Sequence, residues 1–155
     1  IPPKKGRSHV LRIIRELIEF KPQNKKTDLG KAFKYMIDML KKKAIVFVLS
    51  DFMDETYEHK LKIAAKKHDI TGIRVYDERE ESLPSLGLVQ MQDAETGALH
   101  WVNTSSSSVQ KTYQQNYQDQ VNYFYRAFKL SGSGYVNCRV DESYVKKLLA
   151  YFKRR

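Results

Sequence analysis

Three aspartates directly follow two apolar runs of the chain, and their positions suit metal binding. Asp51 and Asp54 come after residues 44–50 (AIVFVLS), and Asp77 comes after residues 70–76. If both runs are parallel strands, their carboxyl ends share the sheet edge at which open α/β folds bind ligands. Such acids hold a divalent cation through their oxygens, or they cap the helix that follows each strand. The sequence leaves these two interpretations equally open.

Other chemistry-bearing patterns are absent from the sequence. There is no nucleophile elbow, no phosphate-binding glycine loop with a lysine and no dinucleotide fingerprint. The four histidines, at positions 9, 59, 68 and 100, show none of the paired spacings of zinc sites. We therefore name no catalytic residue and expect a protein that is not an enzyme.

The chain is basic, but its basicity is concentrated near its start. Residues 1–43 carry 13 Lys/Arg and 4 Asp/Glu, whereas residues 44–140 carry 10 and 12. The lysines at helix ends are explained by solvation and by the helix dipole. The alternative is a surface for a polyanion or an acidic protein, which includes nucleic-acid binding through the basic first segment.

Composition also bounds the environment of the protein. No apolar run approaches the roughly 18 residues of a membrane span, so we expect no membrane partner. The single cysteine, Cys138, lies in an apolar segment and reads as a small buried hydrophobe. One cysteine excludes an internal disulfide and fits a reducing compartment, so we expect a cytoplasmic protein.

The acids require a parallel sheet to position them. The uncharged run at residues 44–50 predicts a strand buried on both faces. A helix over residues 55–68 separates it from the strand at 70–76, which is the βαβ signature. Further predicted elements are a helix that Ser8 caps and Pro22 ends, a polar loop over 23–26, a helix that Thr27-Asp28 opens with a capping hydroxyl, an antiparallel hairpin at about 86–103, a helix over 108–130, a strand over 135–140 and a helix over 143–153. We expect one α/β domain over residues 1–155, with a mostly parallel sheet between helix layers.

Two predicted helices carry a clear apolar stripe. The stripe of the 108–130 helix comprises Tyr113, Tyr117, Val121, Phe124 and Phe128 and predicts core packing rather than base stacking. We expect the last helix to bury Val145, Leu148, Leu149 and Phe152.

Six segments in order resemble a known family. They are IPPKKGRSHVLRIIREL at the start, TDLGKA, VFVLSDF, IRVYDERE, DAETG in the hairpin and VDESYVKKLLAYFKRR at the end. Together they resemble the bacterial von Willebrand factor A (vWA)-like family known as domain of unknown function number fifty-eight. Its members are typically encoded beside MoxR-type AAA+ ATPases. The resemblance implies a three-layer vWA or Rossmann-like fold.

The resemblance also implies a metal site, the metal-ion-dependent adhesion site of vWA domains. Thr27 matches its threonine and Asp51 its last aspartate, and Asp54 is a further candidate ligand. The Asp-x-Ser-x-Ser loop of such sites does not occur in the sequence, and Asp141-Glu142-Ser143 is only a distant likeness. We therefore expect a C-terminal fragment whose metal loop preceded Ile1. Mg²⁺ or Mn²⁺ would bind the intact protein and bind this fragment weakly or not at all.

The same reasoning predicts an exposed sheet edge at residues 44–50, through which the fragment forms a homodimer or aggregates. The function that the resemblance implies is non-enzymatic protein interaction, with a MoxR-type ATPase as suspected partner in assembling or remodelling other proteins. The alternatives are a metal-dependent phosphoester hydrolase using Asp51, Asp54 and Asp77, and the nucleic-acid binding mentioned above.

Overall fold

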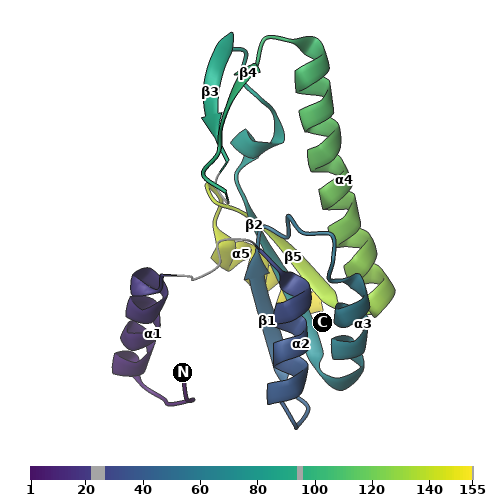
Figure 1. The fold of residues 1–155 in the computed structure, drawn as a ribbon. Coiled ribbons are helices and arrows are strands. Elements are labelled where there is room, and N and C mark those ends of the chain that lie inside the picture. The colour runs from purple at the N-terminus through teal and green to yellow at the C-terminus, as the bar shows by residue number, and fades with distance from the viewer. Residues whose placement is uncertain (22–26, 94–95, 155) are drawn as a thin grey trace.

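Apolar runs and amphipathic stripes alternate along the chain, and they form a mixed α/β fold (Figure 1). The computed structural model describes residues 1–21, 27–93 and 96–154. Its helices are α1 (Arg7–Glu19), α2 (Leu29–Met39), α3 (Glu58–Lys67), α4 (Ser107–Ser131), α5 (Tyr144–Arg154) and a 3₁₀ turn, η1 (Glu78–Glu81). Its strands are β1 (Ile45–Ser50), β2 (Asp69–Tyr76), β3 (Leu88–Gln92), β4 (Leu99–Asn103) and β5 (Gly134–Arg139).

Three of these strands form a parallel sheet in the order β1-β2-β5. β1 pairs with β2 so that Ser50 lies beside Arg74, and Arg74 in turn lies beside Asn137 of β5. Helix α3 connects β1 to β2, as the βαβ pattern requires. β3 and β4 form a separate antiparallel pair. The predicted parallel sheet and hairpin are therefore confirmed.

The main core lies between one face of the sheet and helices α2, α3 and α4. Its buried side chains are mostly aromatic or aliphatic: Leu29, Phe33, Phe52, Tyr57, Leu61, Ala64, Ile70, Phe124, Ala127 and Phe128. Gly72 of β2 lets α4 approach the sheet, because a Cβ there would lie 2.5 Å from the Phe128 ring. The predicted stripe of the long helix is confirmed as core at Tyr117, Phe124 and Phe128.

A smaller cluster covers part of the opposite face. Leu148 and Tyr151 of α5 pack on Ile73, Val136 and Cys138. Cys138 is 5 % exposed, which confirms it as a buried hydrophobe, and burial raises the pKa of its thiol.

The prediction that residues 44–50 are buried on both faces is wrong. Alternate residues of β1 face outward, with Ile45 67 % and Leu49 66 % exposed. β1 lies at the edge of the three-stranded sheet, and α5 packs mainly against β5 at the other edge. From α5, the ring of Phe152 meets Phe47 of β1 edge-on at 5.8 Å.

The expected burial along α5 is also wrong for most of its stripe. Val145, Leu149 and Phe152 are each about half exposed; Leu148 packs into the small cluster on the sheet, and Phe152 contacts Phe47 of β1. The reason is geometric, because one helix covers too little of a sheet face to bury a stripe of four residues.

Helix α1 stands apart from the rest of the molecule (Figure 1). None of its residues is buried, and Leu17 and Ile18 are 74 % and 79 % exposed. It begins at Arg7 after Gly6 rather than with a Ser8 cap, and it ends at Glu19. Pro22, which we expected to end it, and the predicted loop at 23–26 lie outside the described residues. The single domain over residues 1–155 stays a prediction.

The hairpin lies along the first half of α4 as a projecting arm (Figure 1). Met91 and Val102 of the hairpin and Val109 and Tyr113 of α4 line a hollow of about 400 Å³ between them. The Tyr113 hydroxyl donates to the Glu80 carbonyl over 2.9 Å, which ties the arm to η1. Within the residues described, no helix has both the length and the apolar character needed to cross a membrane.

Candidate functional site at the carboxyl edge of the sheet

The turn after β1 holds Asp51 in an exposed position. Its Oδ1 accepts weak hydrogen bonds from the Ser50 hydroxyl at 3.2 Å and the Met53 amide at 3.3 Å. The Ser50 hydroxyl in turn accepts from the Phe52 amide at 3.1 Å. Asp51 Oδ2 accepts no hydrogen bond from any residue that the structure describes. Half of this carboxylate therefore faces solvent and can bind something else.

Phe52 fixes the direction of this turn. It has φ 59°, in the left-handed region that non-glycine residues rarely adopt. Its side chain is 1 % exposed, and its ring centroid lies 4.6 Å from that of Phe124 and 5.3 Å from that of Phe128. The core anchors Phe52 strongly enough to hold the strained backbone, a combination that often occurs at functional sites.

Asp54 has a different role in the same loop. Its Oδ2 accepts from the Leu29 amide at 2.7 Å, at the start of α2. Its Oδ1 accepts from both the amide and the hydroxyl of Thr56 at 2.8 Å. Both oxygens are engaged, so this carboxylate joins the β1–α3 loop to the amino end of α2.

That bond brings Thr27 close to the acidic loop. Thr27 is exposed and precedes Leu29 by two residues, so its segment lies against the loop that carries Asp51 and Asp54. The cap of α2 is Asp28 rather than Thr27, because the Asp28 carboxylate accepts from the Lys31 amide at 2.7 Å. Hydrogen bonds from the Lys31 side chain and amide lower the pKa of Asp28.

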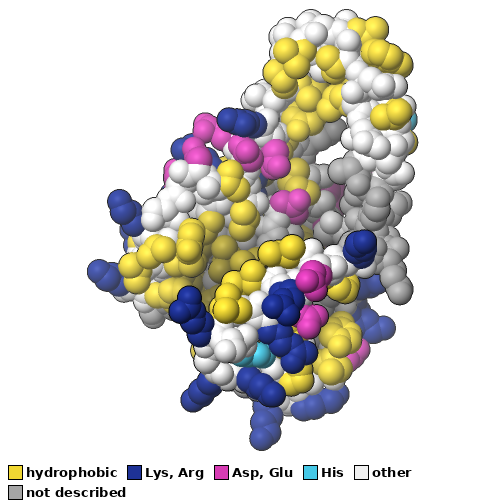
Figure 2. Space-filling model, turned by 90° about the vertical axis from the view of Figure 1, so that its left-hand side faces the viewer, with side chains coloured by type: hydrophobic (Ala, Val, Ile, Leu, Met, Phe, Trp, Pro, Cys, Tyr) yellow, Lys and Arg dark blue, Asp and Glu magenta, His cyan; other side chains and the backbone are white. Residues whose placement is uncertain are grey.

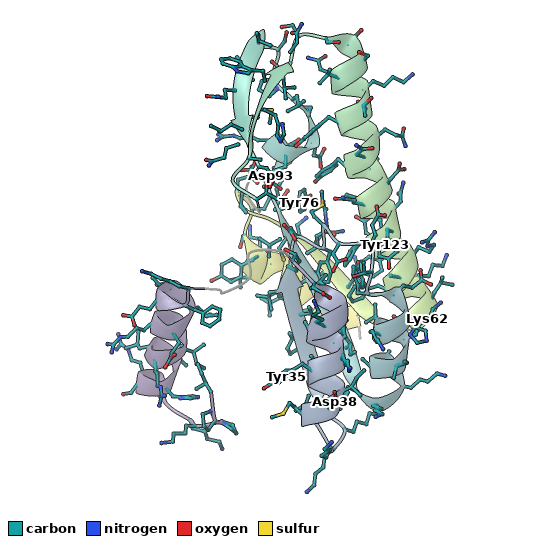
Figure 3. All side chains as sticks on the ribbon, viewed as in Figure 1. Tyr35, Asp38, Lys62, Tyr76, Asp93 and Tyr123 are labelled. Carbon is teal, nitrogen blue, oxygen red and sulfur yellow. The ribbon has the colours of Figure 1, made fainter. Side chains whose placement is uncertain are left out.

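Asp77 lies at the same edge, at the end of β2, next to Tyr76 (labelled in Figure 3). The predicted placement of Asp51 and Asp77 on one edge is therefore confirmed. Asp77 accepts from the Arg79 amide at 3.0 Å and caps η1, so the helix-cap interpretation holds for this residue. The neighbouring Glu78 pairs with Arg139 of β5 at 2.7 Å.

Arg74 is the residue at this edge that sequence reasoning missed. It is 4 % exposed, its Nη2 donates to the Tyr117 hydroxyl at 2.7 Å, and its guanidinium lies 4.4 Å from the Tyr76 ring centroid. No described carboxylate pairs with it. Burial raises the pKa of Tyr117, so Tyr117 stays a neutral partner. The sequence did offer a signal for this residue, because Arg74 is a charged residue within the apolar run ITGIRVY.

The family model described as "Protein of unknown function DUF58" matches residues 1–123 of the chain. The chain belongs to the DUF58 family. Uncharacterised proteins of Mycobacterium bovis and Mycobacterium avium are each 28% identical to it, over 102 and 100 residues. No solved structure matches the chain significantly.

The matched part of this DUF58 chain is 64% of its length in the M. bovis comparison and 63% in the M. avium comparison. The match spans 32% of the M. bovis relative and 59% of the M. avium relative. The chain therefore spans about a third to about three fifths of the length of these curated relatives.

The side-chain oxygens at the carboxyl edge of the sheet suit a hard cation only in part. Hydroxyl and carboxylate oxygens are the ligands that Mg²⁺ prefers, and Thr27, Asp51 and Asp54 offer them. Asp54 is already engaged on both oxygens, which leaves Asp51 as the carboxylate open to direct coordination. In the part of the chain that the structure describes, no three His, Cys, Asp or Glu residues are grouped to hold a metal ion.

Proposed function

We propose that this DUF58 chain is a protein-interaction module of the vWA-like kind rather than an enzyme. Its partner binds at the carboxyl edge of β1 and β2. The supporting observation is the exposed Asp51 carboxylate, held on a turn whose strained backbone is anchored by the buried Phe52. A rigid support under an exposed acid is what a specific contact requires, since little side-chain freedom is then lost on binding.

The partner we propose is a MoxR-type AAA+ ATPase, acting with this protein in the cytoplasm to assemble or remodel other proteins. The family resemblance supports the ATPase, and the lone buried Cys138 supports the compartment. The structure adds a reason to favour interaction over phosphoester hydrolysis. Asp54 and Asp77 hold backbone amides, so the three acids of the hydrolase alternative are not free to act together.

We also propose that Thr27 and Asp51, with Asp54 in support, contribute to a Mg²⁺ or Mn²⁺ site in the intact protein. The cation would supply positive charge toward an acidic group of the partner. Donors from outside the described residues would have to complete the six oxygens that Mg²⁺ requires.

A Mn²⁺ titration followed by NMR tests the cation part. We expect weak, selective broadening of the Thr27 and Asp51 amide signals, absent in Asp51→Ala and retained in Asp119→Ala. Asp119 is an exposed acid on α4 and serves as the matched control. Uniform broadening, or equal broadening in both variants, would remove the metal from the proposal.

An affinity measurement tests the interaction itself. A MoxR-type ATPase from the same organism is immobilised, and binding of the chain is recorded with and without Mg²⁺. We expect Asp51→Asn to weaken binding by about tenfold or more, which is typical for loss of a desolvated charge contact. Asp119→Asn should bind like the parent chain. Equal affinity of all three proteins would contradict the proposed surface.

A further inference from the structure

An apolar surface over β1 is left bare on the face of the parallel sheet that carries α5. Phe47 points to this face, because its ring meets that of Phe152 of α5. Leu49 lines a hollow of about 320 Å³ on the same face. Ile45 shares the face by alternation along β1 and is 67 % exposed. We call the surface formed by Ile45, Phe47 and Leu49 the β1 face.

The β1 face has room for one more helix. Parallel sheets are normally covered by helices on both faces. A helix is about 10 Å wide and strands lie about 4.8 Å apart, so three strands need two helices on each face. Of the helices that the structure describes, only α5 packs on this face, and it lies mainly against β5. A helix is therefore missing beside it.

Helix α1 has the shape that would fill this place. Its 13 residues make a helix about 20 Å long, and the 6 residues of β1 make a strand of about the same length. Val10, Ile14 and Leu17 follow one another at helical spacing, and none of them is buried. A single helix of this length is only marginally stable in water, so α1 requires a surface on which to bury its stripe.

The charges of α1 indicate which surface that is. Arg7 lies in its first turn, whereas Glu16 and Glu19 lie in its last two turns. The helix dipole favours the reverse arrangement, and no side chain caps the start of α1. A helix whose charges oppose its own dipole breaks a local rule, and such breaks are expected at functional contacts.

The two ends of the β1 face carry the matching charges. Asp51 follows β1 at the carboxyl edge, where Arg139 is shared by three further acids: Glu78, Asp141 and Glu142. Lys41–Lys43 directly precede β1 at the amino edge, where the strands begin. Figure 2, which views the side of the molecule where α1 stands, shows exposed hydrophobic side chains and Lys and Arg gathered at the lower end. A helix with the charges of α1 therefore fits the β1 face antiparallel to β1.

The α1 of the same chain is poorly placed for this orientation. It leads into α2, whose first residue, Leu29, is bonded to Asp54 at the carboxyl edge. That connection brings the last turn of α1, with its acids, toward the acidic end of the β1 face. We propose that α1 packs antiparallel to β1 on the β1 face of a second copy of this chain. Reciprocal exchange of the two helices closes a two-fold dimer, and this proposal does not rest on the ATPase contact.

Sedimentation over a concentration series tests the exchange. We expect the parent chain to dimerise reversibly and Leu17→Gln to weaken the dimer by about tenfold or more, since one aliphatic side chain is no longer buried. Leu130→Gln is the matched control, because Leu130 is an exposed leucine near the end of α4. A monomeric parent, or equal weakening by both variants, would overturn the proposal. So would dissociation by Leu49→Lys without any effect of Leu17→Gln, which would indicate pairing through the strand edge.

Arg7→Glu separates the contact from the intrinsic stability of the helix. An acid in the first turn favours an isolated helix. In the proposed dimer the same acid faces the acidic carboxyl edge, so we expect weaker dimerisation. Unchanged or tighter dimerisation would overturn the antiparallel arrangement.

Disulfide formation between two chains tests the geometry directly. A chain with Val10→Cys is mixed with a chain with Leu49→Cys under mild oxidation, and the native Cys138 stays buried. We expect a disulfide between the two chains, formed several-fold faster than in a mixture of Leu17→Cys and Leu49→Cys chains. Equal rates for the two mixtures would contradict the orientation. A disulfide within one chain carrying both Val10→Cys and Leu49→Cys, formed at every dilution, would overturn the second copy as the occupant.

Discussion

Asp51 and Asp54 are three residues apart, yet their carboxylates do different work. Asp54 accepts three hydrogen bonds at 2.7–2.8 Å and joins α2 to the β1–α3 loop. Asp51 accepts two longer ones at 3.2–3.3 Å on a single oxygen and is exposed. Short bonds from backbone amides to a carboxylate stabilise the fold, so Asp54 is a structural residue and Asp51 a candidate for binding.

This contrast predicts that two alanine variants differ in their free energy of unfolding. Asp54→Ala leaves the Leu29 and Thr56 amides without their acceptor and should lower the free energy of unfolding by about 1–2 kcal/mol. Asp51→Ala should change it by less than about 0.5 kcal/mol, as is usual for exposed positions. Urea unfolding followed by circular dichroism measures both values. Equal destabilisation by the two variants would show that we have assigned the roles wrongly.

The sequence predicted where this site lies better than it predicted which of its residues are free to bind a partner. Strand ends follow local rules, so the shared edge of Asp51 and Asp77 could be anticipated, whereas the assignment of Thr27 to the same site as Asp51 came from the family resemblance. Which acid is engaged by a backbone amide 25 residues away could not, because that depends on how α2 packs. Arg74 was missed for the same reason, since its partner Tyr117 comes from a distant helix.

Among the elements, α3 links the acidic loop to α4. Glu58 in its first turn accepts from Lys62 at 2.7 Å and pairs with Arg126 of α4 at 3.5 Å. Its backbone amide, at the first position of α3, donates to the Tyr123 hydroxyl at 3.0 Å. Figure 3 labels Lys62 and Tyr123 on these neighbouring helices. The α3–α4 contact is thus partly ionic.

The hydrogen bond from Lys62, aided by the charges of Lys62 and Arg126, lowers the pKa of Glu58. A carboxyl whose pKa is lower in the folded state stabilises the fold above its unfolded pKa of about 4.3. This stability is lost as the pH falls through the lower, folded-state value. We therefore expect Glu58→Gln to be less stable than the parent at pH 6 and to approach it at pH 3. A stability difference that does not change between these pH values would contradict the assignment.

At the element scale, strand and helix positions followed from periodicity, but burial did not. The run AIVFVLS is equally apolar on both sides, and only the arrangement β1-β2-β5 decides which side is covered. For α1 and α5 too, the sequence did not show which residues are buried. Their stripes predict amphipathic helices correctly, yet Leu17 of α1 and Leu149 of α5 stay exposed because burial depends on the neighbouring elements.

At the scale of the whole molecule, β1 presents both an unpaired strand edge and an apolar face. Ile45 and Leu49 are two-thirds exposed on that face, and no described strand pairs with the outer edge of β1. An exposed apolar edge favours association with another chain. Self-association of this chain through β1 therefore remains our prediction.

A lysine placed on this surface should suppress the association. We expect Leu49→Lys to shift the chain toward monomer in light scattering across a concentration series, since a charge on an edge strand opposes pairing. Leu86→Lys is the control, because Leu86 is similarly exposed at 68 % but lies before the hairpin. A parent chain that is monomeric at all concentrations, or equal effects of both lysines, would count against the β1 interface.

The two ends of the parallel sheet also differ in character. The carboxyl edge carries the exposed Asp51 and the buried Arg74, and the amino edge carries lysines near the buried His68. The protein partner that we propose binds at the carboxyl edge.

Hydrogen exchange with a bound MoxR-type ATPase tests that claim most directly. We predict slower amide exchange over residues 50–56 and 27–29 in the complex, with little change at the β3–β4 hairpin or at 41–43. The Asp51→Asn chain under the same conditions should lose this protection. Protection confined to the hairpin or to the lysine-rich turn, with residues 50–56 unchanged, would contradict the proposed binding surface.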